Sequence, residues 1–440
     1  MSASRSAALA VAALACQALF ADKISVSQDR VDALYSSGET AAFTVSVSGD
    51  DGKLLSSGTA KWTLDNFGSK SIASGSADLS QGNPFTVKGS MSEPGFLRLI
   101  VKSSTNSVTW GVGYDVTKIR QDEPRPADFD EYWTSEKARL AREVPLDAKM
   151  TPDEKLSTKD AEVFRVNFAT FGGKRVYGFL AVPRDKSAAP FPLLVEVPGA
   201  GPGAVKPWTV RKDAITLVMN VHMFEPAATG EEQRRLMQEA NAALSEKFGF
   251  KKPVYCGVIG IGVSRESFHY HDVMLGINRA VDWAAELDGV DKTRVVYSGS
   301  SQGGAFGLFL NYLNPRFTKA FIAVAACTGH YASHQRRANG WPQIVASQPN
   351  AESKANAEKF ARYFDGVNFA AAIRHPVRFL VGFADTTCPP PDVYAAFNAC
   401  PAKDKEMLNC IGSGHSWAAT YSKNRKELGW PDYKEWLLSK

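Results

Sequence analysis

A short segment of the chain combines a serine with closely spaced glycines. Gly299, Ser301 and Gly303 form a Gly-x-Ser-x-Gly pattern. An apolar, β-branched run from Arg294 precedes the pattern, and a mostly apolar segment, Ala305 to Leu313, follows it. This pattern forms a nucleophile elbow when it lies on a sharp turn between a strand and a helix. The serine hydroxyl is then exposed on a strained turn. The segment therefore predicts a nucleophilic serine, against the alternative of a Gly/Ser-rich turn without chemistry.

Two later loops supply the partners that such a serine needs, because its hydroxyl is a weak nucleophile without a base. Asp385 follows the apolar run that ends at Gly382, and His415 lies in a glycine-rich loop after the next apolar run. The order serine, aspartate, histidine is that of the α/β-hydrolase fold, and parallel sheets build their sites at the carboxyl ends of strands. The sequence predicts a catalytic triad of Ser301, Asp385 and His415.

An oxyanion hole for this chemistry needs two backbone N–H donors. The first expected donor is the amide of Gln302, directly after the nucleophile. The second should come from the loop that follows Val197, and Ala200 is the favoured residue. Gly199 and Gly201 are alternatives in the same loop.

The elements that must position these residues follow an alternating pattern after about residue 160. Helical stretches such as Asp272 to Leu287 lie between apolar runs, and Gly172-Gly173 predicts an antiparallel hairpin. Near-continuous apolar strands that alternate with helices indicate a buried, largely parallel sheet. The expected fold is therefore an α/β-hydrolase with helices on both faces of its sheet. The predicted strands are Phe191 to Val197, Ala214 to Val221, Arg294 to Tyr297, Ala320 to Ala325, Val377 to Gly382 and Glu406 to Ile411.

The region before this pattern has a different character. Residues 22–117 contain short alternating strands separated by turn residues, which predicts a small immunoglobulin-like β-sandwich. Its strands hold no catalytic candidate, so we expect small-ester chemistry without it. A charged linker follows, and residues 118–440 form the predicted catalytic domain, in which the polar segment Thr328 to Glu358 is expected to cap the site.

Composition excludes several function classes. The net charge is +5 over 440 residues, without a Lys/Arg cluster, so nucleic acid is not an expected partner. No cysteine or histidine cluster has metal-ligand spacing, and neither a metal nor a cofactor is expected. His269 and His271 are spaced by two but lack a third partner, which favours histidines at the start of a helix or on the surface.

Residues 1–21 combine Arg5, a short apolar core and a small-residue end, as in a secretory signal peptide. Cleavage near Ala21 is favoured over lipidation of Cys16, and no membrane segment is expected after signal removal. The protein is thus expected to be secreted or periplasmic. The other cysteines number five, so at least one is expected to be free, and no spacing compels a Cys400–Cys410 pair.

Several motifs together resemble the acetyl xylan esterase/cephalosporin-C deacetylase family. They are Gly-Ser-Ser-Gln-Gly-Gly (299–304), Asp-Thr-Thr-Cys-Pro-Pro (385–390), Gly-His (414–415), the segment from Arg125 to Trp133, Val290-Asp291, and the segment from Tyr363 to Ala370. The similarity covers about residues 119–440. It implies a serine carboxylesterase that removes acetyl groups from sugars without metal or cofactor, often as a homo-oligomer.

The chain departs from this family pattern around the site. Pro198-Gly199-Ala200 stands where the family has His-Gly-Tyr, and His222-Met223-Phe224 where it has Arg-Gly-Gln. Ser416-Trp417 follows the histidine in place of a glutamate. The triad is untouched by these changes, so hydrolysis is expected, while the substrate and the oligomer contacts are open.

These observations predict an exported esterase that removes short acyl groups from carbohydrate esters such as acetylated xylan oligosaccharides. Alternatives on the same fold are an esterase for other small acyl esters and a serine peptidase, although the N-terminal region lacks the propeller repeats that often gate such peptidases. An alternative of another class is a carbohydrate-binding protein with a relic triad, which the intact set of three residues disfavours.

Overall fold

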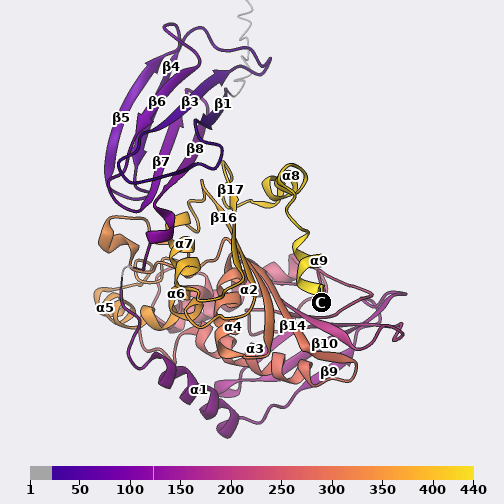
Figure 1. Cartoon of the computed structure of the whole chain (residues 1–440). Helices are drawn as coiled ribbons and strands as arrows, with labels where there is room; N and C mark the ends of the chain where they lie inside the picture. Colours follow the sequence, from indigo (N-terminus) through magenta and orange to yellow (C-terminus); the bar gives the residue numbers. More distant parts are fainter. Residues whose placement is uncertain (1–21, 122) are drawn as a thin grey trace, which may run out of the picture.

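The computed structural model describes residues 22–121 and 123–440, and the predicted signal segment lies outside them. A nine-stranded sheet forms the centre of the larger part of the molecule, in the order β17-β16-β15-β14-β12-β13-β11-β10-β9 (Figure 1). Its strands are β9 (Lys149–Pro152), β10 (Ala161–Ala169), β11 (Arg175–Pro183), β12 (Phe191–Val197), β13 (Ile215–Met219), β14 (Val290–Ser300), β15 (Phe317–Ala323), β16 (Val377–Gly382) and β17 (Lys405–Cys410).

The strands that lead to the predicted site are parallel. β13, β12, β14, β15, β16 and β17 pair in parallel, whereas β9, β10 and β11 add an antiparallel edge. All residues of β12 and β13 are buried, which explains why both read as continuous apolar runs. The predicted hairpin at Gly172-Gly173 is confirmed, because β10 and β11 pair on either side of it.

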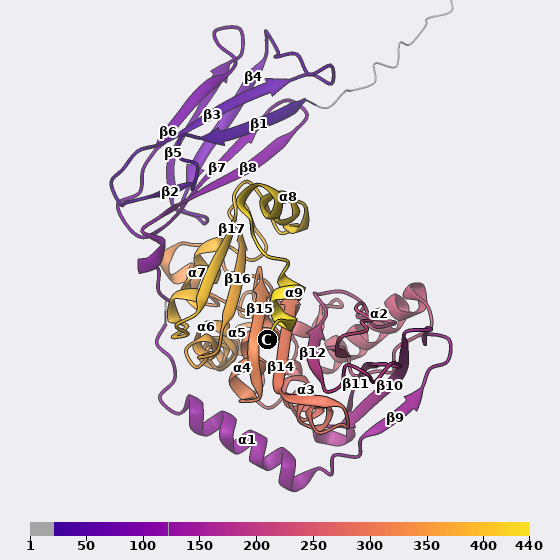
Figure 2. The same ribbon diagram turned by 45° about the vertical axis from the view of Figure 1, so that its right-hand side comes forward.

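Helices cover both faces of this sheet (Figure 2). Tyr297 on β14 faces α4 and donates a hydrogen bond to the Gly303 carbonyl, whereas Phe321 on β15 stacks on Tyr433 of α9 on the other face. The fold is therefore the predicted α/β-hydrolase. The helices are α1 (Phe129–Glu143), α2 (Gly230–Lys247), α3 (His269–Ala285), α4 (Gln302–Leu313), α5 (Ala351–Phe360), α6 (Gly366–Ala370), α7 (Pro390–Ala399), α8 (Ala418–Leu428) and α9 (Tyr433–Leu438).

The N-terminal region contains two further sheets. One has the strand order β1-β3-β6 and the other β2-β8-β7-β4-β5. Side chains of β3 alternate between buried and less buried positions, as the period of two requires. The assignment of residues 22–117 to an immunoglobulin-like domain stays a prediction. The strands are β1 (Lys23–Gln28), β2 (Leu34–Tyr35), β3 (Ala41–Ser48), β4 (Thr59–Asp65), β5 (Ser71–Asp78), β6 (Phe85–Gly89), β7 (Gly95–Lys102) and β8 (Ser107–Tyr114).

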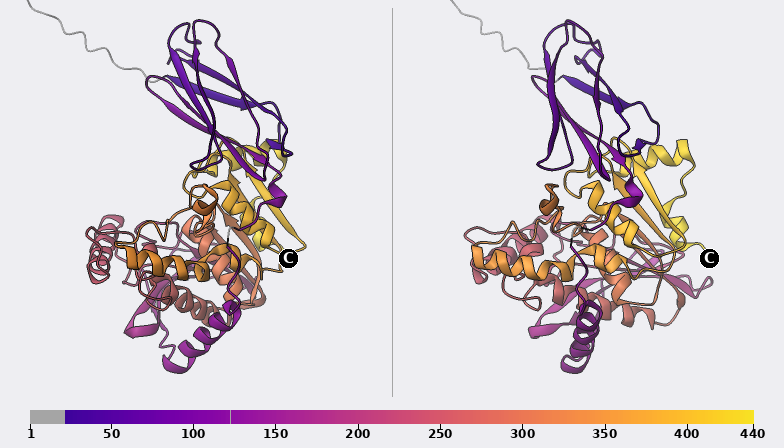
Figure 3. Two further views of the ribbon diagram at one scale, coloured as in Figure 1. Left: turned by 90° about the vertical axis from the view of Figure 1, so that its left-hand side faces the viewer. Right: turned by 60° about the vertical axis from the view of Figure 1, so that its left-hand side comes forward.

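These N-terminal sheets lie against the C-terminal part of the chain, drawn in orange and yellow (Figure 3). The contacts involve Phe383 and Gly412, which are near Asp385 and His415 in the sequence. The ring of Phe96 meets that of Phe383 edge to face, with centroids 5.0 Å apart. A Cβ on Gly111 would lie 1.9 Å from the Phe383 carbonyl oxygen, and one on Gly412 would lie 2.4 Å from the Trp110 ring. We call these contacts the seam.

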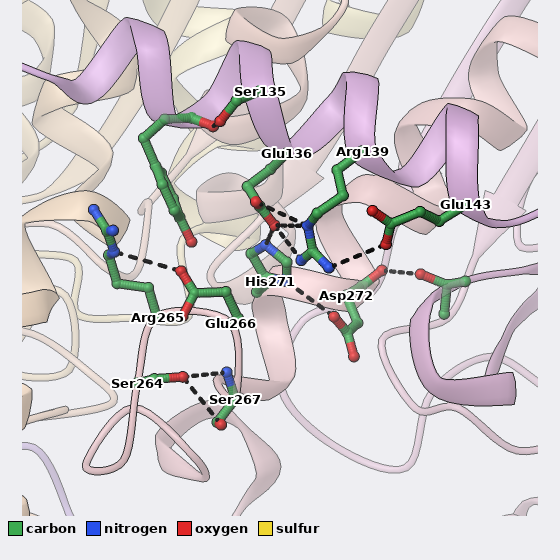
Figure 4. A network of polar contacts seen from close by, with 12 residues as sticks. Ser135, Glu136, Arg139, Glu143, Ser264, Arg265, Glu266, Ser267, His271 and Asp272 are labelled. Atoms are coloured by element: carbon green, nitrogen blue, oxygen red, sulfur yellow. Dashed lines mark hydrogen bonds and ion pairs between the residues drawn. The ribbon is translucent and has the colours of Figure 1, made fainter.

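A buried charge network joins α1 to α3 (Figure 4). His271 is fully buried between carboxylates, with Nε2 2.8 Å from Glu136 and Nδ1 2.9 Å from Asp272. The expectation of a surface histidine is wrong here, although α3 does begin at His269. The partner Glu136 could not be predicted, because it lies far from His271 in the sequence and reaches it only through the packing of α1 on α3.

Candidate active site

The turn between β14 and α4 has the strain expected of a nucleophile elbow. Ser301 has φ 59° and ψ −120°, a backbone conformation that L-residues rarely adopt. The flanking glycines are needed for space: a Cβ on Gly299 would lie 2.4 Å from the Gly303 carbonyl oxygen, and one on Gly303 would lie 2.2 Å from that of Val197. The sharp turn at Ser301 therefore requires glycine at both positions, because a side chain at either one would force the turn apart.

The three residues predicted as a triad lie in one hydrogen-bonded chain. Nε2 of His415 is 2.9 Å from Oγ of Ser301, and Nδ1 of His415 is 2.8 Å from Oδ2 of Asp385. Each residue follows the carboxyl end of a parallel strand: β14, β16 or β17. This geometry lets the imidazole take a proton from the serine while the carboxylate fixes the ring.

Asp385 is fixed more firmly than its place in a loop suggested. Its side chain is fully buried, and Oδ1 accepts hydrogen bonds from the backbone amides of Thr387 and Cys388, at 2.8 and 3.0 Å. The other carboxylate oxygen is thereby aimed at His415. A buried carboxylate without these donors would be costly, so the loop supplies the hydrogen bonds that its burial requires.

The amide predicted as an oxyanion donor belongs to Gln302, the first residue of α4, so its N–H precedes the helical hydrogen-bond ladder. The loop that follows β12 lies alongside: a Cβ on Gly199 would be 3.9 Å from the Cβ of Ser301. The amide of Gly201 donates instead to the hydroxyl of Tyr255, at 3.3 Å. Gly201 is thus the weakest of the three residues considered for the second donor, and Ala200 and Gly199 are left.

The side chain of Gln302 ties this loop to α4, a role that the sequence did not reveal. Its Nε2 donates to the carbonyls of Pro198 and Gly199, at 3.1 and 3.3 Å. Its Oε1 accepts from the hydroxyls of Tyr255 and Tyr270, at 2.9 and 2.7 Å. Because Gln302 is almost fully buried, these bonds fix the orientation of the loop that flanks the nucleophile.

His222 is a second buried side chain that contacts this loop. Its Nε2 lies 2.7 Å from the Gly201 carbonyl, its ring stacks on Phe224, and burial lowers its pKa. His222 begins the segment that replaces the Arg-Gly-Gln of the family pattern. A neutral, buried imidazole suits a structural role beneath the loop.

The segment between β15 and β16, in which Thr328 to Glu358 is predicted to cap the site, contacts residues around the triad. Trp341 donates its backbone amide to the Thr387 carbonyl at 2.8 Å, which joins this segment to the Asp385 loop. The Trp341 ring also lies 5.4 Å from that of Tyr255, centroid to centroid. The segment thus contacts both the acid loop and the residues around Gln302.

One group of possible metal donors overlaps the triad. Asp385, Cys388 and His415 each place a ligand atom within 4.8 Å of the others, a cluster that the sequence spacing did not predict. Both ring nitrogens of His415 are engaged in the hydrogen bonds above, and burial raises the pKa of the Cys388 thiol well above its usual value. Metals bind thiolates, so these residues fit a triad beside a protonated thiol better than a metal site. All five described cysteines are free and buried.

Sequence comparisons relate this chain to acetyl esterases. Residues 114–430 match the model of the acetyl xylan esterase family. An acetyl esterase, Axe7A, of Xylanibacter ruminicola is 28% identical over 349 residues, which cover 77% of this chain and 75% of that protein.

Solved structures show the same fold. An acetyl xylan esterase from a Paenibacillus species superposes with a TM-score of 0.57 at 20% identity, covering 71% of this chain and 97% of that one. Acetyl xylan esterase 1 from a Thermoanaerobacterium species gives a TM-score of 0.57 at 19% identity, covering 71% and 96%.

Proposed function

Since the chain belongs to the acetyl xylan esterase family and is a carboxylic ester hydrolase, we propose that it releases acetate from acetylated plant oligosaccharides by a Ser-His-Asp mechanism. The observation that carries the mechanism is the continuous hydrogen-bonded chain from Ser301 through His415 to Asp385. Within the described residues, no helix has the length and apolar character needed to cross a membrane.

Each member of this hydrogen-bonded chain has its own role in the proposed acylation step. His415 Nε2 takes the proton of Ser301 Oγ as this oxygen attacks the ester carbonyl carbon. Asp385 holds the ring and stabilises the imidazolium that forms. The carbonyl oxygen becomes an oxyanion, which the amide of Gln302 and a second amide, for which Ala200 is favoured over Gly199, stabilise.

The tetrahedral intermediate then collapses, and the imidazolium gives its proton to the leaving sugar oxygen. Water, activated by the same histidine, attacks the acyl-serine and releases acetate. Every proton in this cycle passes through His415 Nε2. The mechanism therefore explains why Asp385 is buried and fixed by backbone amides: the ring must keep one orientation through both steps.

Hydrolysis of other small esters is the second candidate, and one observation favours it. Ala200 is exposed in the loop beside the nucleophile, where the family pattern has a tyrosine. A methyl group in place of a ring leaves room for acyl groups larger than acetyl.

The test is acetate release by the purified full chain from acetylated xylo-oligosaccharides, with aryl acetates, longer aryl esters and peptides in parallel. Release from the oligosaccharides supports the proposal. Turnover of peptides alone would assign a peptidase, and inactivity on every ester would leave the triad as a relic. Export is part of the proposal, and a mature N-terminus near Asp22 in secreted material would support it.

A further inference from the structure

A cavity adjoins the nucleophile on the face of the sheet opposite to α4. It holds about 170 Å³, and its walls come from the ends of β12 and β14, from β15, from the loop around Trp208 and from α9. Gly199 and Ser300 are part of the wall, so the cavity begins beside the backbone of Ser301. The triad residues, Gln302 and Ala200 are not among the residues that line it.

Four aromatic side chains line this cavity: Trp208, Phe321, Trp417 and Tyr433. Trp417 is held in place, because its Nε1 donates to Ser300 Oγ at 2.9 Å, and Tyr433 stacks on Phe321 with centroids 4.2 Å apart. Trp208, by contrast, is 52% exposed. A large aromatic ring that is half exposed beside a cavity can pack against a flat apolar surface of a ligand.

A buried carboxylate faces the same cavity. Glu196 on β12 is 5% exposed, and its Oε1 accepts from the Thr209 hydroxyl at 3.2 Å and lies 3.8 Å from Lys434 Nζ. No described residue donates a hydrogen bond to its Oε2. Oε2 is itself buried, so Glu196 contributes to the wall of the cavity as a polar side chain, and Oε2 is not open to it.

We propose that this cavity is a glycosyl subsite, which holds a neutral sugar ring on the alcohol side of the ester. The proposal rests on the proposed function, because it requires a carbohydrate ester as substrate. The C–H face of a sugar ring is apolar and packs on aromatic rings, while its edge carries hydroxyls that can hydrogen-bond to polar residues of the wall, among them Ser298 and Lys434. Lys434 and Glu196 carry opposite charges, which favours a neutral ring over a uronate.

The acyl chain fits this cavity less well than the sugar. An acyl chain carries no hydroxyl, so it would offer no hydrogen-bond partner to the polar residues of the wall. Apolar walls with a few polar groups that fix orientation are also typical of small-molecule sites. The sugar therefore accounts for both the aromatic and the polar part of the wall.

The test compares Trp208→Ala with the wild type on an acetylated xylo-oligosaccharide and on 4-nitrophenyl acetate. We expect KM for the oligosaccharide to rise by roughly tenfold, about 1.4 kcal/mol, with kcat and the aryl ester kinetics little changed. Trp208→Phe should restore most of the affinity. Val210→Ala is the matched control, because Val210 is also exposed on this loop but does not line the cavity.

Xylobiose as an inhibitor of 4-nitrophenyl acetate hydrolysis tests the subsite independently of carbohydrate ester turnover. The wild type should be inhibited, and Trp208→Ala should need roughly tenfold more xylobiose. If the wild type released no acetate from oligosaccharides but xylobiose still inhibited it in a Trp208-dependent way, the proposed substrate would fail and the subsite would stand.

Three results would overturn the subsite. One is an unchanged oligosaccharide KM in Trp208→Ala together with equal xylobiose inhibition. The second is an equal loss on both ester classes, which would indicate a structural role for the ring. The third is a Trp208→Ala change confined to the preference between acetyl and butyryl aryl esters, which would assign the cavity to the acyl group.

Discussion

Ser301 is the residue whose role can be separated most cleanly from stability. Its hydroxyl hydrogen-bonds to His415, and its backbone conformation is imposed by the glycines around it. We expect Ser301→Ala to lower kcat on 4-nitrophenyl acetate by about 10⁴-fold or more, with little change in unfolding temperature. Steady-state kinetics and thermal unfolding check both parts.

Ser300→Ala is the control for this substitution, because its hydroxyl accepts from Trp417 Nε1 and does not contact His415. A loss below about tenfold is expected there. Near-wild-type turnover by Ser301→Ala would remove Ser301 from the nucleophile's role.

Ala200 bears on acyl selectivity. A methyl group at this position leaves space beside the ester. His222 and Phe224 could have filled this space, but their rings stack on each other. A hydrophobic pocket discriminates by only about 1–3 kcal/mol per methylene. We therefore expect kcat/KM for propionyl and butyryl aryl esters within roughly tenfold of acetyl. A loss of about a thousandfold from acetyl to butyryl would mean a closed pocket.

That Ser301, Asp385 and His415 lie together could be predicted at this scale, because each residue type has few alternatives in its motif context. Gln302 shows the limit. Its backbone amide is predicted as an oxyanion donor, but its side chain also hydrogen-bonds to Pro198, Gly199, Tyr255 and Tyr270. These partners come from separate parts of the chain, and no local pattern encodes them.

At the scale of elements, the Gln302 side chain couples α4 to the loop after β12. Gln302→Ala keeps the backbone amide but removes four hydrogen bonds, two to the loop and two from tyrosines. We expect kcat to fall by roughly 10²-fold with a smaller effect on KM, the size of effect seen when one oxyanion donor is lost.

Tyr270→Phe is the matched control for Gln302→Ala. It removes one of those four bonds and leaves both contacts to the loop, so its effect should be much smaller. Equal kinetics for Gln302→Ala and wild type would show that the loop holds its orientation by other means.

The network between α1 and α3 makes stability depend on pH. Burial alone would lower the pKa of His271, but hydrogen bonds to Asp272 and Glu136 raise it above 6.5. Burial alone would raise the pKa of Glu136, but His271 and Arg139 lower it to about 2. Stabilisation from His271 is thus complete below pH 6.5 and is lost as the pH rises through its folded pKa, while that from Glu136 is lost as the pH falls from 4.5 toward 2.

His271→Gln should therefore destabilise most between pH 4.5 and 6.5, by about 3–5 kcal/mol, and less at alkaline pH. Urea unfolding of both proteins across the pH range measures this difference. Glu143→Gln is the control on the same helix, since its exposed pairs contribute at most about 1 kcal/mol. A pH-independent difference for His271→Gln would contradict the charged state of the network.

The predicted elements were most accurate where hydrophobicity was continuous. β12 and β16 have the predicted bounds, because each is an apolar run with clear limits. β14 begins at Val290, earlier than the predicted start at Arg294. Its first residues include the polar Asp291, Lys292 and Thr293, so they do not read as part of an apolar strand. α2 was not predicted, because most of its surface is polar and its few buried residues include Gln233 and Asn241.

At the scale of the whole molecule, the sequence placed two regions in order but did not show how they meet. The N-terminal strands contain no catalytic candidate, which led to the expectation that small esters are hydrolysed without them. The seam changes this expectation. Phe96 packs against both Phe383 and Tyr394, and Phe383 lies two residues before Asp385. The N-terminal sheets thus contact the loop that carries Asp385.

Gly111→Ala in the full chain tests this support directly. The new Cβ would lie 1.9 Å from the Phe383 carbonyl oxygen, a backbone atom that cannot yield without moving the Asp385 loop or the N-terminal sheets. Because small misplacements of catalytic groups are costly, we expect kcat on 4-nitrophenyl acetate to fall by roughly 10- to 100-fold. Gly82→Ala is the control, since its Cβ would meet no atom closer than 4.0 Å. If both variants kept wild-type kcat, the N-terminal sheets would pack on the loop without orienting Asp385.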